Sequence, residues 1–206
     1  MGHRPSSRQG GLTVVELLIV VALVAIVLTL AAPSFREMVE MRRLRAISAQ
    51  LVTDVQYARS EAGARQRKVF MTFGSSVALG MSCYVIHTCG NNSGCSCNCT
   101  AVAGSRCTGS NVEVRTVQVP TSTGVKVALT PAGVTLPSYI AFDPATGGML
   151  ALTSNPLGPP TQLPDPAWMD TSLIRASPPT LRTVVAPSGR PTVCAPGTPV
   201  SGAPAC

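Results

Sequence analysis

The chain has 206 residues, which is enough for one globular domain and one additional segment, and its formal net charge is +7. Gly and Pro each occur 18 times while aromatic residues make up only 4%, so the composition argues against a helical bundle and favours a β-rich or loop-rich domain. The positive charge favours anionic partners such as DNA, phospholipid or acidic polymers, without identifying one of them.

The first predicted element is an apolar helix at residues 12–32, whose only charged residue is Glu16. As a helix it spans about 30 Å, the thickness of the hydrocarbon core of a bilayer. A cleaved signal peptide is one interpretation, but Pro33 follows the small-residue site Ala31-Ala32 and opposes a cut there. An ordinary signal anchor is another, but it leaves the costly carboxylate of Glu16 unexplained.

A third interpretation accounts for the whole pattern. The segment Gly11-Leu12-Thr13-Val14-Val15-Glu16-Leu17 resembles the processing site of type IV prepilins. In that family a membrane aspartyl peptidase, prepilin peptidase, cuts after the glycine and N-methylates the new first residue. The resemblance therefore implies a leader at residues 1–11, cleavage between Gly11 and Leu12, methylation of Leu12, and assembly roles for Glu16 and Pro33.

The physical chemistry of this segment agrees with such roles. Cleavage creates a positive amine at Leu12, and Glu16 can neutralise the amine of a neighbouring subunit inside an apolar filament core, where a charge needs a partner. We therefore interpret Glu16 as an assembly residue rather than a catalytic acid. Pro33 lacks an N–H group and is expected to bend or locally melt the helix.

Beyond Pro33 the pattern predicts an amphipathic continuation of the helix over residues 33–68. Apolar residues recur at spacings of three and four from Phe35 to Ala62, and the helix is expected to end near Arg65–Lys68 and to pack on the domain.

Four arginines follow the apolar segment, and a positive-inside count alone would place the C-terminal side of this segment in the cytoplasm. These are Arg36, Arg42, Arg43 and Arg45. The processing motif and the cysteines favour the opposite orientation, with these arginines on the solvent face of the helix.

From residue 69 onward the periodicity predicts short strands separated by Gly, Pro, Asn or Ser turns. The expected strands are 69–73, 83–87, 112–119, 125–130, 139–142, 149–152, 173–176 and 181–186. The predicted fold is α+β, a long kinked N-terminal helix packed on an antiparallel β-sheet domain with disulfide-rich loops. This domain is expected at residues 69–194, followed by a C-terminal tail at 195–206. Residues 153–170 hold five prolines and predict an irregular loop, which Trp168 either pins to the domain or uses for a subunit contact.

The distal half also resembles the GspH/FimT-like branch of minor pilins and pseudopilins. The resemblance rests on Phe142-Asp143-Pro144-Ala145-Thr146-Gly147 and on Val184–Cys194, which contains Gly189-Arg190. It implies a minor subunit of a type IV pilus or a type II secretion pseudopilus, anchored once in the bacterial inner membrane with its domain in the periplasm. Its implied partners are other pilins or pseudopilins and prepilin peptidase, with no small-molecule substrate.

Some FimT-like proteins bind DNA through a Gly-Arg-x-Arg stretch, and this resemblance gives an alternative function in DNA uptake. Gly189 and Arg190 match the stretch, but Thr192 occupies the position of the second arginine. The candidate DNA contacts are Arg190, Arg182 and Arg175, because phosphate binding needs several cations. No aromatic platform for base stacking accompanies them.

All eight cysteines lie in the distal domain: Cys83, Cys89, Cys95, Cys97, Cys99, Cys107, Cys194 and Cys206. Their even number predicts disulfides formed in an oxidising compartment, and Cys194 with Cys206 is a candidate for closing the tail. The alternative is a membrane-anchored metal-binding module that uses thiolates and His87, although the Cys-x-Cys-x-Cys run is not the usual zinc spacing. We expect no metal and no cofactor, and sequence alone does not select a connectivity.

We expect no enzymatic activity and assign no catalytic residues. The sequence contains no nucleotide-binding glycine-rich loop, no His-Glu-x-x-His and no nucleophile elbow. A triad would have to use His87, since the other histidine, His3, lies in the leader. Asp143, Asp165 and Asp170 are expected to be loop acids without evident partners.

Overall fold

The computed structural model describes residues 13–90, 95, 97–130, 139–150 and 166–206. The chain divides into two compact units, Met1–Val39 and Glu40–Cys206, called unit 1 and unit 2 below. The single described α-helix, α1, runs from Val14 to Arg65 and confirms the predicted long N-terminal helix.

The helix starts at a side-chain cap. The Thr13 hydroxyl accepts a hydrogen bond of 3.2 Å from the backbone N–H of Glu16, which satisfies one of the free N–H groups of the first turn. The helix ends in a Schellman arrangement at Gln66, whose φ is 52°. There the N–H groups of Gln66 and Arg67 donate to the carbonyls of Gly63 and Ala62, both at 3.3 Å. Local sequence therefore sets both ends of the helix.

Among the described residues, no single helical segment is long and apolar enough by itself to cross a membrane. Two consecutive parts of α1, Val14–Thr29 and Ser34–Arg65, pass that test only together, by length and composition, and are bent relative to each other. The bend falls in the four-residue stretch that contains Pro33, where the kink of the predicted fold class was expected.

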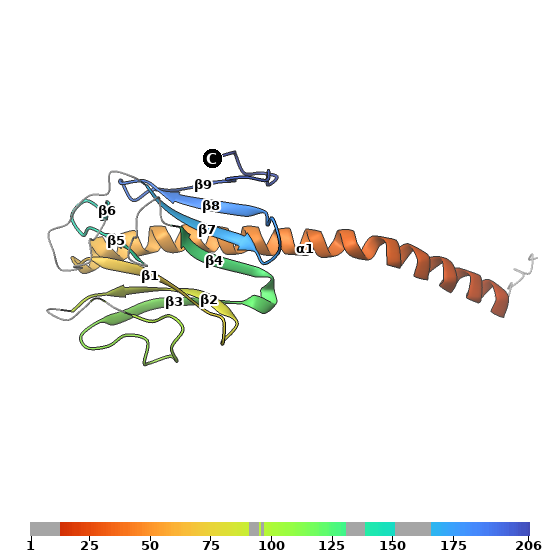
Figure 1. Cartoon of the computed structure of the whole chain (residues 1–206), viewed down its shortest axis with the longest axis horizontal. Helices are drawn as coiled ribbons and strands as arrows, with labels where there is room; N and C mark the ends of the chain where they lie inside the picture. The colour runs from red at the N-terminus through yellow and green to blue at the C-terminus, as the bar shows by residue number, and fades with distance from the viewer. Residues whose placement is uncertain (1–12, 91–94, 96, 131–138, 151–165) are drawn as a thin grey trace, which may run out of the picture. The chain divides into compact units, whose positions relative to one another are not determined.

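Unit 2 contains two antiparallel sheets (Figure 1). The five-stranded sheet has the order β3-β2-β1-β5-β6, with bounds Val112–Pro120, Met81–Thr88, Val69–Ser76, Tyr139–Phe142 and Met149–Leu150. The four-stranded sheet has the order β4-β7-β8-β9, with bounds Val125–Thr130, Ala167–Leu173, Thr180–Val185 and Pro191–Cys194. A short 3-10 helix, η1, Thr121–Thr123, joins β3 to β4. The α+β expectation is confirmed.

The strand predictions fail around β7. The expected strand 173–176 is wrong, because β7 ends at Leu173 and the next residues form a bend that includes Ser177 at φ 48°, directly before Pro178. The expected irregular stretch 153–170 is wrong from Ala167 onward, where β7 begins. Its remaining part up to residue 165, like residues 151–152 of an expected strand, lies outside the described residues.

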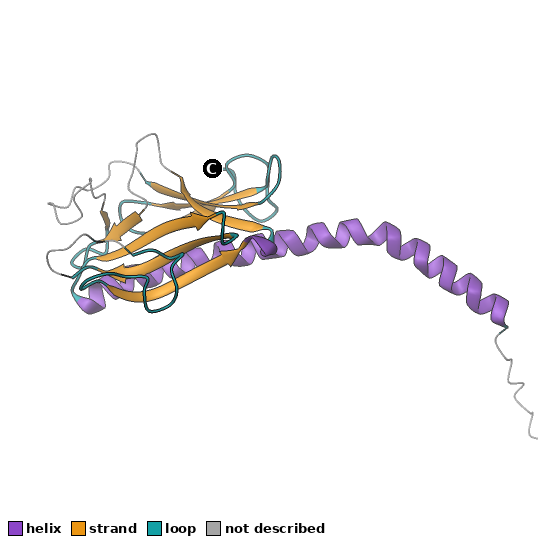
Figure 2. Ribbon diagram, turned by 60° about the horizontal axis from the view of Figure 1, so that its bottom comes forward, coloured by secondary structure: helices purple, strands orange, loops and turns teal. Residues whose placement is uncertain are grey.

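One face of α1 and both sheets share the main core. Leu44, Leu51, Val55, Ala58 and Ala62 are fully buried, on the face that the spacing of apolar residues predicted. They pack with side chains from both sheets, and Figure 2 shows the strands gathered along this part of the helix. The largest of these sheet side chains include Tyr84, Phe142, Met149 and Met169.

Four disulfides join all eight cysteines: Cys83–Cys99, Cys89–Cys95, Cys97–Cys107 and Cys194–Cys206. The first joins β2 to the segment between β2 and β3, and the next two lie within that segment. Their cysteines pack with Val85 and Phe70 in two small clusters beside the main core. The disulfide-rich loops of the predicted fold are thus present. The expected tail is closed on itself, because Ala195 N–H donates to Pro204 O at 2.7 Å and Val200 is buried in the main core.

Candidate assembly segment and arginine groove

The first candidate site is the apolar start of α1, residues 14–29, called the assembly segment below. Its large apolar side chains are about half exposed or more, from Val20 at 49% to Val14 at 74%. Glu16 is the only charged residue between Val14 and Phe35, and Gly11 and Leu12 lie outside the described residues. A continuous apolar surface of this kind needs lipid or other protein to cover it.

The second candidate site was expected at Arg182, Arg175 and Arg190, and the structure places these three arginines in different surroundings. Arg182 lies on β8 and forms a bidentate ion pair with Asp170 on β7, at 2.8 and 2.9 Å. Its guanidinium carbon lies 4.8 Å from the centre of the Trp168 ring, and the bond to Asp170 raises the pKa of Arg182. Asp170 is therefore a paired strand residue, and the expectation of a loop acid without a partner is wrong.

Arg175 lies in the bend after β7, at the opposite end of β8 from Arg190. Its Nη1 atom is 3.6 Å from a carboxylate oxygen of Glu40, and both side chains are 42% exposed. An exposed ion pair of this kind contributes about 0–1 kcal/mol, so Glu40 engages Arg175 only weakly. The three candidate arginines are therefore not brought together into one patch.

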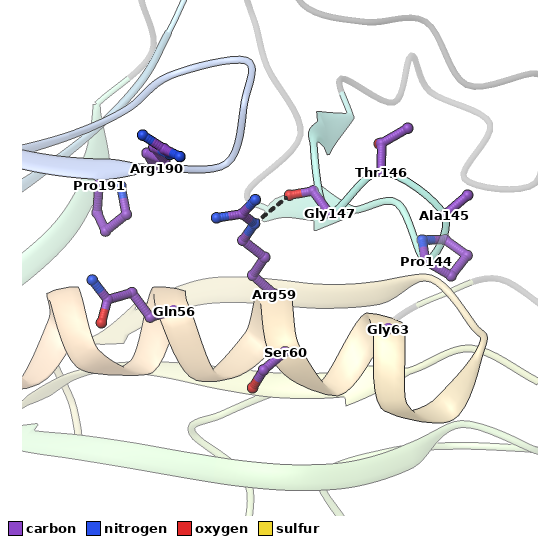
Figure 3. Close-up of a pocket in the computed structure, with 10 residues that line it drawn as sticks. All are labelled: Gln56, Arg59, Ser60, Gly63, Pro144, Ala145, Thr146, Gly147, Arg190 and Pro191. Atoms are coloured by element: carbon purple, nitrogen blue, oxygen red, sulfur yellow. Dashed lines mark hydrogen bonds between the residues drawn. The ribbon is translucent and has the colours of Figure 1, made fainter.

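Arg190 lines an open groove of about 680 Å³, shown in Figure 3 and called the arginine groove below. α1 contributes Arg59 to it, the turn after β5 contributes the backbone around Gly147, and the turn after β8 contributes Arg190. The full lining is Gln56, Arg59, Ser60, Gly63, Pro144, Ala145, Thr146, Gly147, Arg190 and Pro191. It contains two arginines and no acidic side chain.

The groove exists because two glycine turns pack on each other. The N–H of Met149 donates to Pro187 O at 2.8 Å, and Arg59 Nε donates to Gly147 O at 2.9 Å, the bond drawn in Figure 3. Gly147 and Gly189 have φ angles of 64° and 75°, which favour glycine. A Cβ on Gly189 would lie 2.3 Å from Gly147 O, so this approach also requires the absence of a side chain.

The two distal sequence motifs therefore meet in space, and the residue that joins them to the helix is Arg59. Sequence reasoning did not identify Arg59, since its partner Gly147 is 88 positions away. The only available signal was that Arg59 follows Ala58 of the buried helix face and so lies at the edge of that face.

Two buried polar groups lie on β2 and face opposite sides of it. Tyr84 O–H donates to Asp54 Oδ2 at 2.7 Å, and Arg115 Nη1 lies 3.1 Å from Asp54 Oδ1. Burial, and next the bond to the Asp54 carboxylate, raise the pKa of Tyr84. These contacts tie α1 to the five-stranded sheet through one buried carboxylate.

His87 is fully buried, stacks on Phe70 and bonds to the Thr72 hydroxyl at 2.9 Å. Burial lowers the pKa of His87 to about 4, so the ring is neutral at neutral pH.

The metal-site alternative has no thiolate ligands, because every cysteine is in a disulfide. Among the described residues, no group of three His, Cys, Asp or Glu side chains is arranged to hold an ion.

Comparison with known proteins gives two family matches. The family model described as type II transport protein GspH matches residues 48–165, which is more than half of the chain and includes Arg59 and Gly147. The model of the prokaryotic N-terminal methylation motif matches residues 6–32, which include Gly11, Leu12 and Glu16. No curated protein and no solved structure matches the chain.

Proposed function

We propose how this chain works from one premise: it belongs to the GspH family of type II transport proteins and is a pilin-like subunit of a type IV pilus or a type II secretion system. Prepilin peptidase removes residues 1–11 and methylates Leu12. The helix then anchors the subunit in the inner membrane, with residues 69–206 in the periplasm. From there the subunit enters a filament through the assembly segment.

The observation that carries this proposal is the surface of the assembly segment. Its apolar side chains are exposed on all sides of the helix, and Glu16 is the only charge among them. Such a helix is stable in lipid or among similar helices, but not in water. In either surrounding Glu16 needs a positive partner, and the new amine at Leu12 of a neighbouring subunit supplies one.

The cysteines support the proposed orientation. All four disulfides lie in unit 2, and stable structural disulfides form in oxidising compartments such as the periplasm. The arginines that follow the apolar segment then lie on the periplasmic side, despite their number. An enzymatic role is not part of the proposal, because the family is one of structural subunits.

The test separates membrane insertion from assembly. In the native host, Glu16→Ala and Glu16→Gln are compared with the wild type by immunoblotting of the membrane fraction and of the sheared or cross-linked filament fraction. Glu37→Ala, which removes an exposed carboxylate further along α1, is the matched control. Mass spectrometry of the N-terminus reports cleavage before Leu12 and the added methyl group.

We expect both Glu16 variants to be cleaved and to remain in the membrane, while their filament fraction falls at least tenfold, because an unpaired amine in the apolar core costs several kcal/mol. Glu37→Ala is expected to assemble normally. Wild-type levels of Glu16→Ala in filaments, or an N-terminus at a position other than Leu12, would refute the proposal.

A further inference from the structure

Unit 2 carries exposed apolar side chains at the tips of two turns. Val77 and Leu79, in the turn between β1 and β2, are 100% and 57% exposed. Ile174, in the bend after β7, is 46% exposed. Single exposed apolar residues are common, but these three come from turns that lie at the same end of the unit.

Backbone hydrogen bonds through η1 establish that common position. The N–H of Thr121, the first residue of η1, donates to Gly80 O at 2.8 Å, which joins η1 to the β1–β2 turn. The N–H of Ile174 donates to Gly124 O at 2.9 Å, which joins the bend after β7 to the other end of η1. Figure 1 shows both turns beside η1.

Basic residues of α1 border this apolar set. Arg43 Nη1 donates to Thr123 O of η1 at 3.5 Å, and Arg175, next to Ile174, pairs with Glu40. Two arginines and one glutamate therefore lie beside the apolar tips, which leaves a net charge of +1 at the end of unit 2 where the chain enters at residue 40. We call this set of residues the entry patch.

We propose that the entry patch docks on the anionic phospholipid surface of the membrane while the subunit is anchored there, an inference that rests on the proposed function. The chain leaves the apolar segment at Ala32 and enters unit 2 at Glu40, only eight residues later. An end of unit 2 that is joined to the anchor by so few residues stays close to the membrane surface, where headgroups and their screened charge can act on it.

The chemistry of the patch fits this surface in two ways. Val77 and Leu79 can enter the headgroup region, where apolar side chains gain from leaving water. Each arginine near an anionic surface favours the docked state about fivefold, the equivalent of about 1 kcal/mol. Docking also gives Arg43, one of the four arginines after the apolar segment, a role on the periplasmic side, although a positive-inside count would place these arginines in the cytoplasm.

The test uses the full-length protein in lipid nanodiscs, once with phosphatidylcholine alone and once with added phosphatidylglycerol. Backbone hydrogen exchange is followed at residues 76–80 and 174–177. We expect exchange at both turns to slow at least fivefold with phosphatidylglycerol at low salt, and this protection to disappear at high salt. Val77→Asp and Arg43→Gln are expected to reduce it about fivefold each.

Val112→Asp is the matched control, because Val112 is 52% exposed and lies at the other end of β3 from η1. It is expected to leave the lipid-dependent protection unchanged. Three results would overturn the inference: exchange that is equal in the two lipids, full protection in Val77→Asp, or protection that appears in detergent as protein concentration rises, which would show a contact between copies. Loss of the protein from both kinds of nanodisc would instead refute the membrane anchoring of the proposed function.

Discussion

Replacing Gly189 by alanine tests whether the two distal turns are held together by close packing. The change has two separable costs. An L-residue at a φ of 75° costs about 1–2 kcal/mol relative to glycine. In addition, the new methyl group would lie 2.3 Å from Gly147 O, so the turns must move apart, which typically costs about 1–3 kcal/mol more. We expect the free energy of unfolding to fall by about 2–5 kcal/mol.

Two glycines in the disulfide-closed tail separate these costs. Gly202 has a φ of 84° and nothing within 4 Å of an added Cβ, so Gly202→Ala is expected to show only the conformational cost of about 1–2 kcal/mol. Gly197 has neither a positive φ nor a close neighbour, so Gly197→Ala is expected to change stability by less than about 0.5 kcal/mol. The differences among the three variants are more informative than any single value.

The assay is urea unfolding of the full-length protein in detergent with its disulfides intact, followed by the fluorescence of Trp168, the only tryptophan. Trp168 lies on β7, in the same sheet as β8, so its signal reports the unit that contains the turns. We expect Gly197→Ala to be the most stable of the three variants, Gly202→Ala to be less stable, and Gly189→Ala to be the least stable. If Gly189→Ala were no less stable than Gly202→Ala, close packing of the two turns would not contribute to stability.

Two further predictions concern the buried polar groups of β2. Because burial lowers the pKa of His87 to about 4, below the value of about 6.5 for an unfolded chain, the unfolded state takes up the proton first as pH falls. The contribution of neutral His87 to stability is therefore complete above about pH 6.5 and decreases towards pH 4. Between pH 7 and 4.5, the free energy of unfolding measured with urea should fall by about 2–3 kcal/mol more in the wild type than in His87→Asn. An equal loss in both proteins would contradict burial as the cause. Tyr84→Phe leaves Asp54 Oδ2 without its hydrogen bond and should cost about 1–3 kcal/mol, whereas Tyr139→Phe on the half-buried edge of β5 should cost less than about 1 kcal/mol; similar values for the two would contradict a special role for the Asp54 bond.

Elements with a strong periodic signal could be predicted from the sequence. The helix was expected to end near Arg65–Lys68 and ends at Arg65, and two strands, Val125–Thr130 and Tyr139–Phe142, have their expected bounds. Each of these carries apolar residues at the spacing of its secondary structure and is followed by a turn signal. The strand β7 was missed because prolines precede it and because Asp170 and Thr171 resemble loop residues until their partners on β8 are known.

The candidate sites differ in the same way: features carried by consecutive residues could be predicted, and features that depend on contacts between distant residues could not. The exposed apolar start of α1 could be predicted, because its character lies in consecutive residues, whereas the assembly role of Glu16 stays a prediction. The arginine groove could not, because it depends on Arg59 meeting Gly147 and Gly189 from positions far apart in the chain. The ion pair between Arg182 and Asp170 was missed for the same reason, since only the register of β7 and β8 places them opposite each other.

The two parts of α1 have different burial patterns. From Leu44 to Ala62 its buried apolar residues follow spacings of three, four and seven, which confine them to one face against the sheets of unit 2. From Val14 to Leu28 the apolar residues have no such spacing, and all sides of the helix are exposed. A helix made for one protein core needs one apolar face, whereas a helix made for lipid and then for a filament needs apolar residues all around. In that second surrounding a single carboxylate is an exception that requires a partner, and for this reason Glu16, rather than any residue of unit 2, is the position whose change we expect to separate insertion from assembly.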